Sequence, residues 1–226
     1  MRKSLIIAGL LLLPFASSLA QSNIDQHLVD LYQKEAKDYA ALFYSPIETP
    51  FQSTKWINHP YWEVIDCTDG EVCYDGLLYK GLSLRFNAAA QYIAVATPMS
   101  KILVTPDMSR VDYFILFGKK FVKQDDEKFS CLEYDKGIIQ LWYRKNVTKG
   151  PEVIRDRRSY LSYVIKDSYI VRLGKRDYPI KNAKDIAKIF PEYKKEIRKY
   201  VLNARVNTQD KLELMQMTLD YVSSLK

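Results

Sequence analysis

Apolar and polar side chains alternate with a period of two along most of the chain between positions 62 and 173. In the segment GLLYKGLSLRFN, Leu82, Leu84 and Phe86 alternate with polar neighbours, as expected of a strand with one buried face. Arg85 lies between the apolar positions and is therefore expected on the side that faces solvent. On this interpretation, replacing Arg85 with lysine leaves the stability nearly unchanged.

Turn signals separate further segments of the same kind. Alternation recurs at 93–96, 139–144, 161–165 and 169–173, and the run VDYFILF at 111–117 is apolar on both faces after its aspartate. Dipeptides typical of turns lie between the segments at intervals of roughly 8 to 12 residues, with no helix between them. They include Asp69-Gly70, Asp75-Gly76, Phe117-Gly118 and Lys136-Gly137. The pattern predicts an antiparallel β-meander that closes as a sandwich or an open barrel.

Helical periodicity occurs at the two ends of the chain. Residues 23–44 predict an N-terminal helix, with Asn23 and Gln26 placed as in a capping box. After position 179, Asn182 can cap one helix and Pro191 suits the first turn of the next. Asn207 or Thr208 can start a last helix.

The expected fold is therefore α+β, an antiparallel β-meander with an N-terminal helix and two to three C-terminal helices. We predict a signal peptide at 1–20, an N-terminal helix and connector at 21–60, an antiparallel β domain at 61–178 and C-terminal helices packed on the same domain at 179–226.

The first twenty residues have the pattern of a secretory signal peptide. Arg2 and Lys3 precede the apolar run LIIAGLLLLPF, which is too short to span a bilayer. Ser18 and Ala20 give the small-x-small pattern that signal peptidase requires, so cleavage is expected before Gln21. No cysteine lies just past that position, so a lipoprotein anchor is not indicated. We expect a periplasmic or extracellular protein with no integral membrane span after cleavage.

The formal net charge is +7, and it is distributed unevenly. Residues 21–150 contain 15 basic and 17 acidic side chains, whereas residues 151–226 contain 17 basic and 10 acidic ones. This excess suits an anionic partner, but lysines on the solvent face of the C-terminal helices would explain it as well. The densest basic cluster is Arg155, Arg157 and Arg158, with Tyr160 beside it. It is a candidate stacking platform for a glycan or a nucleic acid, or else the polar rim of a hairpin.

The three cysteines, Cys67, Cys73 and Cys131, are an odd number in a chain expected outside the cytoplasm. Cys67 and Cys73 flank a turn signal in CTDGEVC and form a candidate disulfide. A two-residue loop at Asp69-Gly70 would place them on opposite faces, so the bridge requires a longer loop with an odd number of residues. The sequence leaves this pairing open.

Little in the chain indicates catalysis. His27 and His59 lack the spacing of metal ligands, no G-x-S-x-G motif is present and phosphate-binding glycine loops are missing. We therefore expect no metal and no cofactor. Four carboxylates cluster along one segment and favour turns, although paired acids can also hydrolyse glycosides. They are Asp66, Asp69, Glu71 and Asp75.

Four segments of the chain form a recognisable series: HPYW at 59–62, YDGLLYKGLSLRFN at 74–87, VDYFILFGKKFVK at 111–123, and the C-terminal passage VIKDSYIVRL…IAKIFPEYKKEIRKYV. In this order they resemble a family of uncharacterised small secreted proteins of Gram-negative, Bacteroidetes-type bacteria. The resemblance implies a signal peptide, a β-meander and a lysine-rich helical C-terminus, and it implies no catalytic residues. The long N-terminal helix and the extra cysteines depart from the family pattern.

Together these features predict an exported, non-catalytic protein that binds a partner in the bacterial envelope or has a structural role there. The expected partner is an envelope protein or an anionic polymer, and nucleic acid is not expected. The alternative is a hydrolase that acts on cell-wall or glycan material through the acids between positions 66 and 75.

Overall fold

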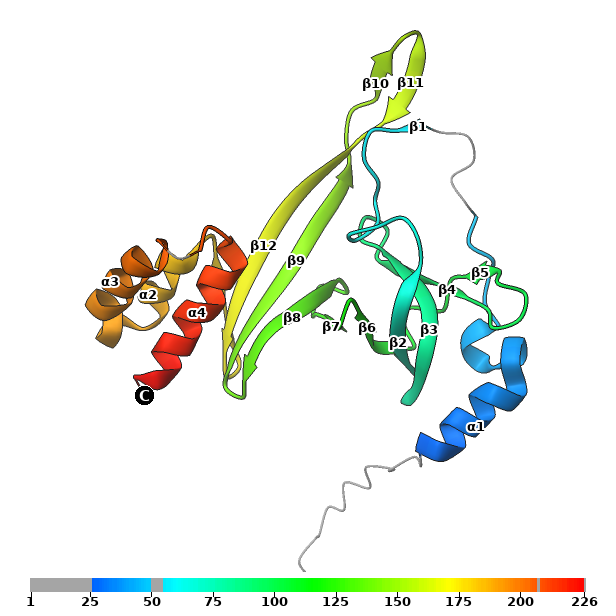
Figure 1. Ribbon diagram of the computed structural model, residues 1–226, viewed down its shortest axis with the longest axis horizontal. Coiled ribbons are helices and arrows are strands. Elements are labelled where there is room, and N and C mark those ends of the chain that lie inside the picture. The colour runs from blue at the N-terminus through cyan, green and yellow to red at the C-terminus, as the bar shows by residue number, and fades with distance from the viewer. Residues whose placement is uncertain (1–25, 50–54, 207, 226) are drawn as a thin grey trace, which may run out of the picture.

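The computed structural model describes residues 26–49, 55–206 and 208–225. Figure 1 shows a twisted sheet with the N-terminal helix at one end, three helices at the other and a narrow arm that projects beyond the strands. The signal peptide and the capping box at Asn23, both expected from the sequence, lie outside the described residues.

The main sheet has ten strands in the order β13-β12-β9-β8-β7-β6-β2-β3-β4-β5, and every neighbouring pair is antiparallel. Its strands are β2 (Thr68–Tyr74), β3 (Leu77–Asn87), β4 (Tyr92–Ala96), β5 (Leu103–Val104), β6 (Val111–Leu116), β7 (Lys119–Lys123), β8 (Phe129–Lys136), β9 (Ile139–Lys149), β12 (Tyr163–Leu173) and β13 (Arg176–Ile180). Most neighbours are consecutive in the chain, as in a meander. The predicted α+β class and antiparallel meander are confirmed, and the sheet is open because β13 and β5 end it without pairing to each other.

The strand register places both hydrophobic cores on one face of the sheet. The first core is aromatic: Phe114 and Phe121 lie opposite each other on β6 and β7 and stack with ring centroids 4.7 Å apart. Trp62 closes this core, with its ring centroid 4.9 Å from that of Phe121 and the two ring planes nearly perpendicular, at 88°. Each buried aromatic ring contributes roughly 1.5–3 kcal/mol by removing apolar surface from water. This cluster therefore stabilises the central strands.

The second core joins the sheet to the C-terminal helices. Strands β9, β12 and β13 pack against α2 (Ile186–Ile189), α3 (Lys194–Ala204) and α4 (Lys211–Ser224). Short 3-10 turns at Ala183–Asp185 and Pro191–Tyr193 precede α2 and α3. Asn182 forms the predicted cap, accepting a bond from the Lys184 amide at 3.0 Å. No helix within the described residues combines the length and apolar character needed to cross a membrane.

The last helix starts later than expected. Asp210 is its N-cap, with Oδ1 accepting a hydrogen bond from the Glu213 amide at 2.8 Å. Thr208 precedes the helix instead of starting it, and its hydroxyl accepts from the Asp210 amide at 3.1 Å. The Asp210 carboxylate is the better cap because it is charged and accepts a hydrogen bond from an amide that has no partner within the helix.

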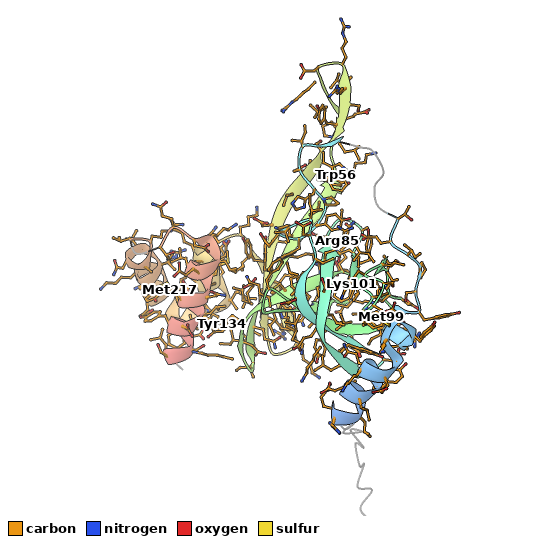
Figure 2. All side chains as sticks on the ribbon, turned by 45° about the vertical axis from the view of Figure 1, so that its right-hand side comes forward. Trp56, Arg85, Met99, Lys101, Tyr134 and Met217 are labelled. Atoms are coloured by element: carbon orange, nitrogen blue, oxygen red, sulfur yellow. The ribbon has the colours of Figure 1, made fainter. Side chains whose placement is uncertain are left out.

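The N-terminal helix is shorter than predicted. Helix α1 spans Gln26–Ala36, and two 3-10 turns, Lys37–Tyr39 and Ala41–Phe43, replace its expected second half. The Asp38 carboxylate accepts bonds from the amides of Met99 at 2.8 Å and Ser100 at 3.1 Å, in the turn after β4. Figure 2 shows Met99 beside this end of the helical segment. This tertiary contact turns the chain away from the helix axis.

The first hairpin turns at Asp75-Gly76 and not at Asp69-Gly70, the loop that was considered for the Cys67–Cys73 pairing. Asp69 and Gly70 lie inside β2, opposite Ser83 and Leu82 of β3, whereas Asp75 and Gly76 form the two-residue loop. Gly70 is required within the strand because a Cβ there would lie 2.4 Å from the Ile115 carbonyl oxygen.

This register explains why the candidate Cys67–Cys73 disulfide is not formed. The two cysteines are six positions apart in extended chain, a span of about 20 Å, whereas a disulfide needs Cα atoms within about 7 Å. Cys67, Cys73 and Cys131 are all free thiols. The Cys73 Sγ donates to the Asp112 carboxylate at 3.4 Å.

Arg85 lies opposite the leucine face, as alternation predicts, but it is not a solvated side chain. Its Nη2 donates to Glu48 Oε2 at 2.6 Å, its Nη1 donates to the Ile65 carbonyl at 2.9 Å, and its guanidinium lies 4.4 Å from the Tyr61 ring centroid. Glu48 Oε1 also accepts bonds from the hydroxyls of Tyr92 at 2.9 Å and Tyr61 at 3.2 Å. The side chains of Arg85 and Glu48 are only 13% and 3% exposed. The prediction of a solvent-facing arginine is therefore wrong.

The two end strands of the sheet offer few free backbone N–H and C=O groups to another strand. Strand β5 has two residues and is covered by the connector, through a bridge from Ile47 to Val104. Strand β13 contains Pro179, which lies opposite Ile170 of β12 and has no N–H group.

Candidate functional site: a basic arm

Strands β9 and β12 form a ribbon that continues past the main sheet. The two strands pair over eleven residues each, from Ile139 opposite Leu173 to Lys149 opposite Tyr163. Beyond that point the chain forms a hairpin of β10 (Val153–Arg155) and β11 (Arg158–Leu161). Strand β1 (Lys55–Trp56) pairs in parallel with β11. We call residues 149–163 the arm; it is the projection at the top of Figure 1.

The base of the arm is held by specific contacts. The Gly150 amide donates to the Ser162 carbonyl at 2.8 Å, and a Cβ at Gly150 would lie 2.7 Å from Ser162 Oγ, so glycine permits this close crossing. Asn58 bridges both backbone groups of Tyr163, donating to its carbonyl at 2.8 Å and accepting from its amide at 2.7 Å. Figure 2 shows Trp56 in the same region. The arm is thus anchored at its base by the connector.

The tip of the arm places two like charges directly opposite each other. Asp156 and Arg157 form the two-residue loop with φ angles of 49° and 58°, as in a type I′ turn. Arg155 therefore lies opposite Arg158, and Tyr160 shares their face of the hairpin. Like charges in this position destabilise a strand pair. Folding alone does not favour this arrangement, which is typical of a functional surface.

The structure brings the predicted cluster together. Arg155, Arg158 and Tyr160 share one face, and Arg157 lies in the adjoining turn. The three arginines are exposed and Tyr160 is half-buried. Ile154, on the other face of the hairpin, is 76% exposed.

The charge of these arginines is not neutralised within the arm. No ion pair among the described residues includes any of the three arginines, and Glu152, a nearby acid, accepts a hydrogen bond from Ser159. Four other arginines, three in strands of the main sheet and one immediately before β6, each have a carboxylate partner. These four are Arg85, Arg110, Arg144 and Arg172. The arm therefore presents free guanidinium groups, which bind carboxylate, sulfate or phosphate oxygens in a bidentate manner.

The carboxylates considered for glycoside hydrolysis do not form a comparable site. Asp66, Asp69 and Asp75 are exposed, and Asp75 lies at the β2–β3 turn beside Arg110. The hydrogen bond from Arg110 lowers the pKa of Asp75. A general acid requires a raised pKa, so this shift has the wrong direction.

Metal binding and cysteine chemistry have no support in the described part of the chain. No group of three or more histidine, cysteine or acidic side chains is placed there to hold a metal ion. Burial raises the pKa of the Cys131 thiol, and it raises that of Cys73 to about 11, with the Asp112 carboxylate as a further cause. Both thiols are thus protonated at neutral pH, whereas a nucleophilic cysteine acts as the thiolate.

A second basic surface was not predicted from the sequence. Lys34, Lys37 and Lys80 line one groove between α1 and β3. The first two lysines are three residues apart, which is the only local signal. Lys80 is distant in the chain, and the near-neutral balance of residues 21–150 gave no reason to expect a basic patch.

Comparison of the chain with protein-family models, with curated proteins and with solved structures finds no match. The resemblance to secreted proteins of Bacteroidetes-type bacteria therefore remains a prediction.

Proposed function

We propose that this is an exported, non-catalytic binding protein of the bacterial envelope that holds an anionic polymer through its arm. The observation that supports this function is the cross-strand pair of Arg155 and Arg158, both exposed and without an acidic partner among the described residues. Export is supported by the signal-peptide pattern of residues 1–20. An anionic group between the two guanidinium groups would remove the repulsion that the free hairpin carries.

The shape of the arm suits a long polymer better than a small ligand. The hairpin projects from the sheet as a narrow arm (Figure 1), and the side chains of its three arginines are exposed. Tyr160 adds a ring next to the charges, on which a sugar or another flat group can pack. Contacts of this kind depend on charge, so binding is expected to weaken steeply with salt.

The test is retention of the whole mature protein on immobilised heparin, a sulfated polysaccharide, in a salt gradient. The double variant Arg155→Ser/Arg158→Ser is expected to bind roughly tenfold more weakly, because two ionic contacts are lost. The variant should fold normally, since the substitutions remove a repulsive pair outside both cores. The matched control is Lys195→Ser/Lys199→Ser on α3, which removes the same charge from an exposed part of the basic C-terminal region.

Earlier elution of the arm variant alone would support the proposal. An equal shift in both variants would show that net charge determines retention. A larger shift in the α3 variant would assign binding to the C-terminal helices. Either of these results would refute the arm as the binding site. If the wild-type protein is not retained, the test excludes an anionic polymer of this class and leaves an envelope protein as the partner to examine.

A further inference from the structure

A second basic surface lies at the opposite end of the sheet from the C-terminal helices. It is an open groove of about 450 Å³ between α1 and β3, lined by Lys34 and Lys37 on one side and Lys80 on the other. Asp30 and Gln33 also line it. The groove is remote in sequence from the arm and does not depend on it.

The walls of this groove are fixed to each other by side-chain bonds from the helix to the strand. Gln33 Nε2 donates to the Lys80 carbonyl at 2.9 Å, and Gln33 Oε1 accepts from the Lys80 amide at 3.4 Å. Near the start of α1, Gln26 Nε2 donates to the Leu78 carbonyl at 2.9 Å. These bonds hold the Lys80 backbone against the helix. The three ammonium groups therefore belong to one surface, although each long side chain can move.

The lysines have no acidic partners among the described residues. None of the ion pairs found there includes Lys34, Lys37 or Lys80. Asp30, the acid that lines the groove, already accepts a hydrogen bond from Gln26 Nε2 at 2.9 Å. With three cations and one anion, the lining has a formal charge of +2.

A left-handed turn at Lys37 ends α1 and places this side chain at the groove. Lys37 has a φ of 49°, a left-handed conformation that costs a side chain other than glycine of the order of 1 kcal/mol. The Asp38 carboxylate, bound to the Met99 and Ser100 amides, holds the chain in this conformation. Glycine or asparagine would suit the backbone better than lysine. The position therefore holds an ammonium group although the backbone conformation favours glycine or asparagine.

We propose that this groove binds a phosphate group. A phosphate monoester carries a charge of about −1.5 to −2 at neutral pH, which matches the lining, whereas a single carboxylate would leave one positive charge unbalanced. Three ammonium groups can each donate to a different oxygen. The phosphate can belong to a soluble ester or to a lipid headgroup, and the open shape of the groove admits both.

Isothermal titration of the full chain with inorganic phosphate tests the site. The variant Lys34→Gln/Lys37→Gln/Lys80→Gln is expected to weaken binding by about fivefold for each lysine removed. The control is Lys194→Gln/Lys195→Gln/Lys199→Gln, which removes the same charge from exposed positions of α3 and should bind phosphate as the wild type does. The single variant Lys34→Gln provides a milder change and should show a fivefold loss.

Two further measurements distinguish phosphate binding in the groove from polymer binding by the arm and from contact with a membrane surface. The arm variant Arg155→Ser/Arg158→Ser should retain phosphate binding, so failure of the polymer proposal does not affect this one. Vesicles of phosphatidylcholine with and without phosphatidic acid identify a lipid source if only the phosphatidic acid vesicles bind and the groove variant loses them. Absence of phosphate binding by the wild type, or equal loss in the groove and α3 variants, would overturn the proposal. Vesicle binding without phosphate binding would overturn it as well, because the contact would then be with the membrane surface.

Discussion

Replacing Arg85 tests whether its charge is part of a buried network. In Arg85→Lys, a single ammonium group takes the place of a planar group that bonds Glu48 and the Ile65 carbonyl at once. Its single nitrogen cannot occupy the positions of both Nη1 and Nη2, so we expect at least one of these bonds to weaken, and lysine loses the stacked position over Tyr61. A hydrogen bond to a charged group contributes about 1.5–3 kcal/mol. We therefore expect the free energy of unfolding to fall by about 2 kcal/mol.

A stronger perturbation is Arg85→Met, which leaves the Glu48 carboxylate without its cation. Removing one partner of a buried ion pair costs about 3–5 kcal/mol because the remaining charge is desolvated. The double variant Arg85→Met/Glu48→Gln should recover part of this loss, since no buried charge then remains. Arg110→Met is the matched control: Arg110 also pairs with a carboxylate, that of Asp75, but both side chains are more than 40% exposed. Its effect should be clearly smaller than that of Arg85→Met.

The measurement is urea unfolding at neutral pH, followed by tryptophan fluorescence. A lower midpoint with an unchanged denaturant slope identifies a change in stability rather than in the compactness of either state. A loss below about 1 kcal/mol for Arg85→Met would refute the reasoning, because substitutions on the surface rarely exceed about 0.5 kcal/mol. Arg85 would then be solvated, as alternation alone predicts.

Two further predictions concern the thiols and the carboxyl groups. Without reductant, the denatured chain should react with a thiol reagent at all three cysteines, since Cys67 and Cys73 are too far apart to pair and Cys131 is free; mass spectrometry showing a bridge would contradict the β2–β3 register. The hydrogen bond from Arg144 lowers the pKa of Asp126 below its ordinary value of 3.8, so this carboxyl contributes stability above that pH and loses it as the pH falls through the lowered pKa. Asp126→Asn should flatten the acid limb of stability against pH, and an unchanged limb would contradict the pairing.

Local sequence patterns were sufficient to predict the structure where a segment's structure depends on its own residues. Alternation in β3 identified which face holds Leu84 and which holds Arg85, and the cap at Asn182 followed from its neighbours. The basic cluster of the arm could be foreseen for the same reason, because Arg155 and Arg158 are close in the chain and meet across one short turn.

Contacts between segments that are distant in the chain explain what the sequence-based predictions missed or got wrong. Arg85 is buried because Glu48 reaches it from the connector, and no spacing in the sequence links the two residues. The first helix ends early because Asp38 bonds to the turn after β4. The lysine groove has the same origin, since Lys80 joins Lys34 only when α1 packs on β3.

The two ends of the open sheet determine how this chain can meet other chains. Strand addition requires a row of free backbone donors and acceptors, which a two-residue strand and a strand containing Pro179 do not supply. Addition of a peptide from another protein as an eleventh strand is therefore disfavoured. Assembly of copies of this chain into fibres through the two end strands is disfavoured for the same reason. Contacts along these two borders must instead use side chains, so charge substitutions, and not backbone register, should govern which molecules associate there.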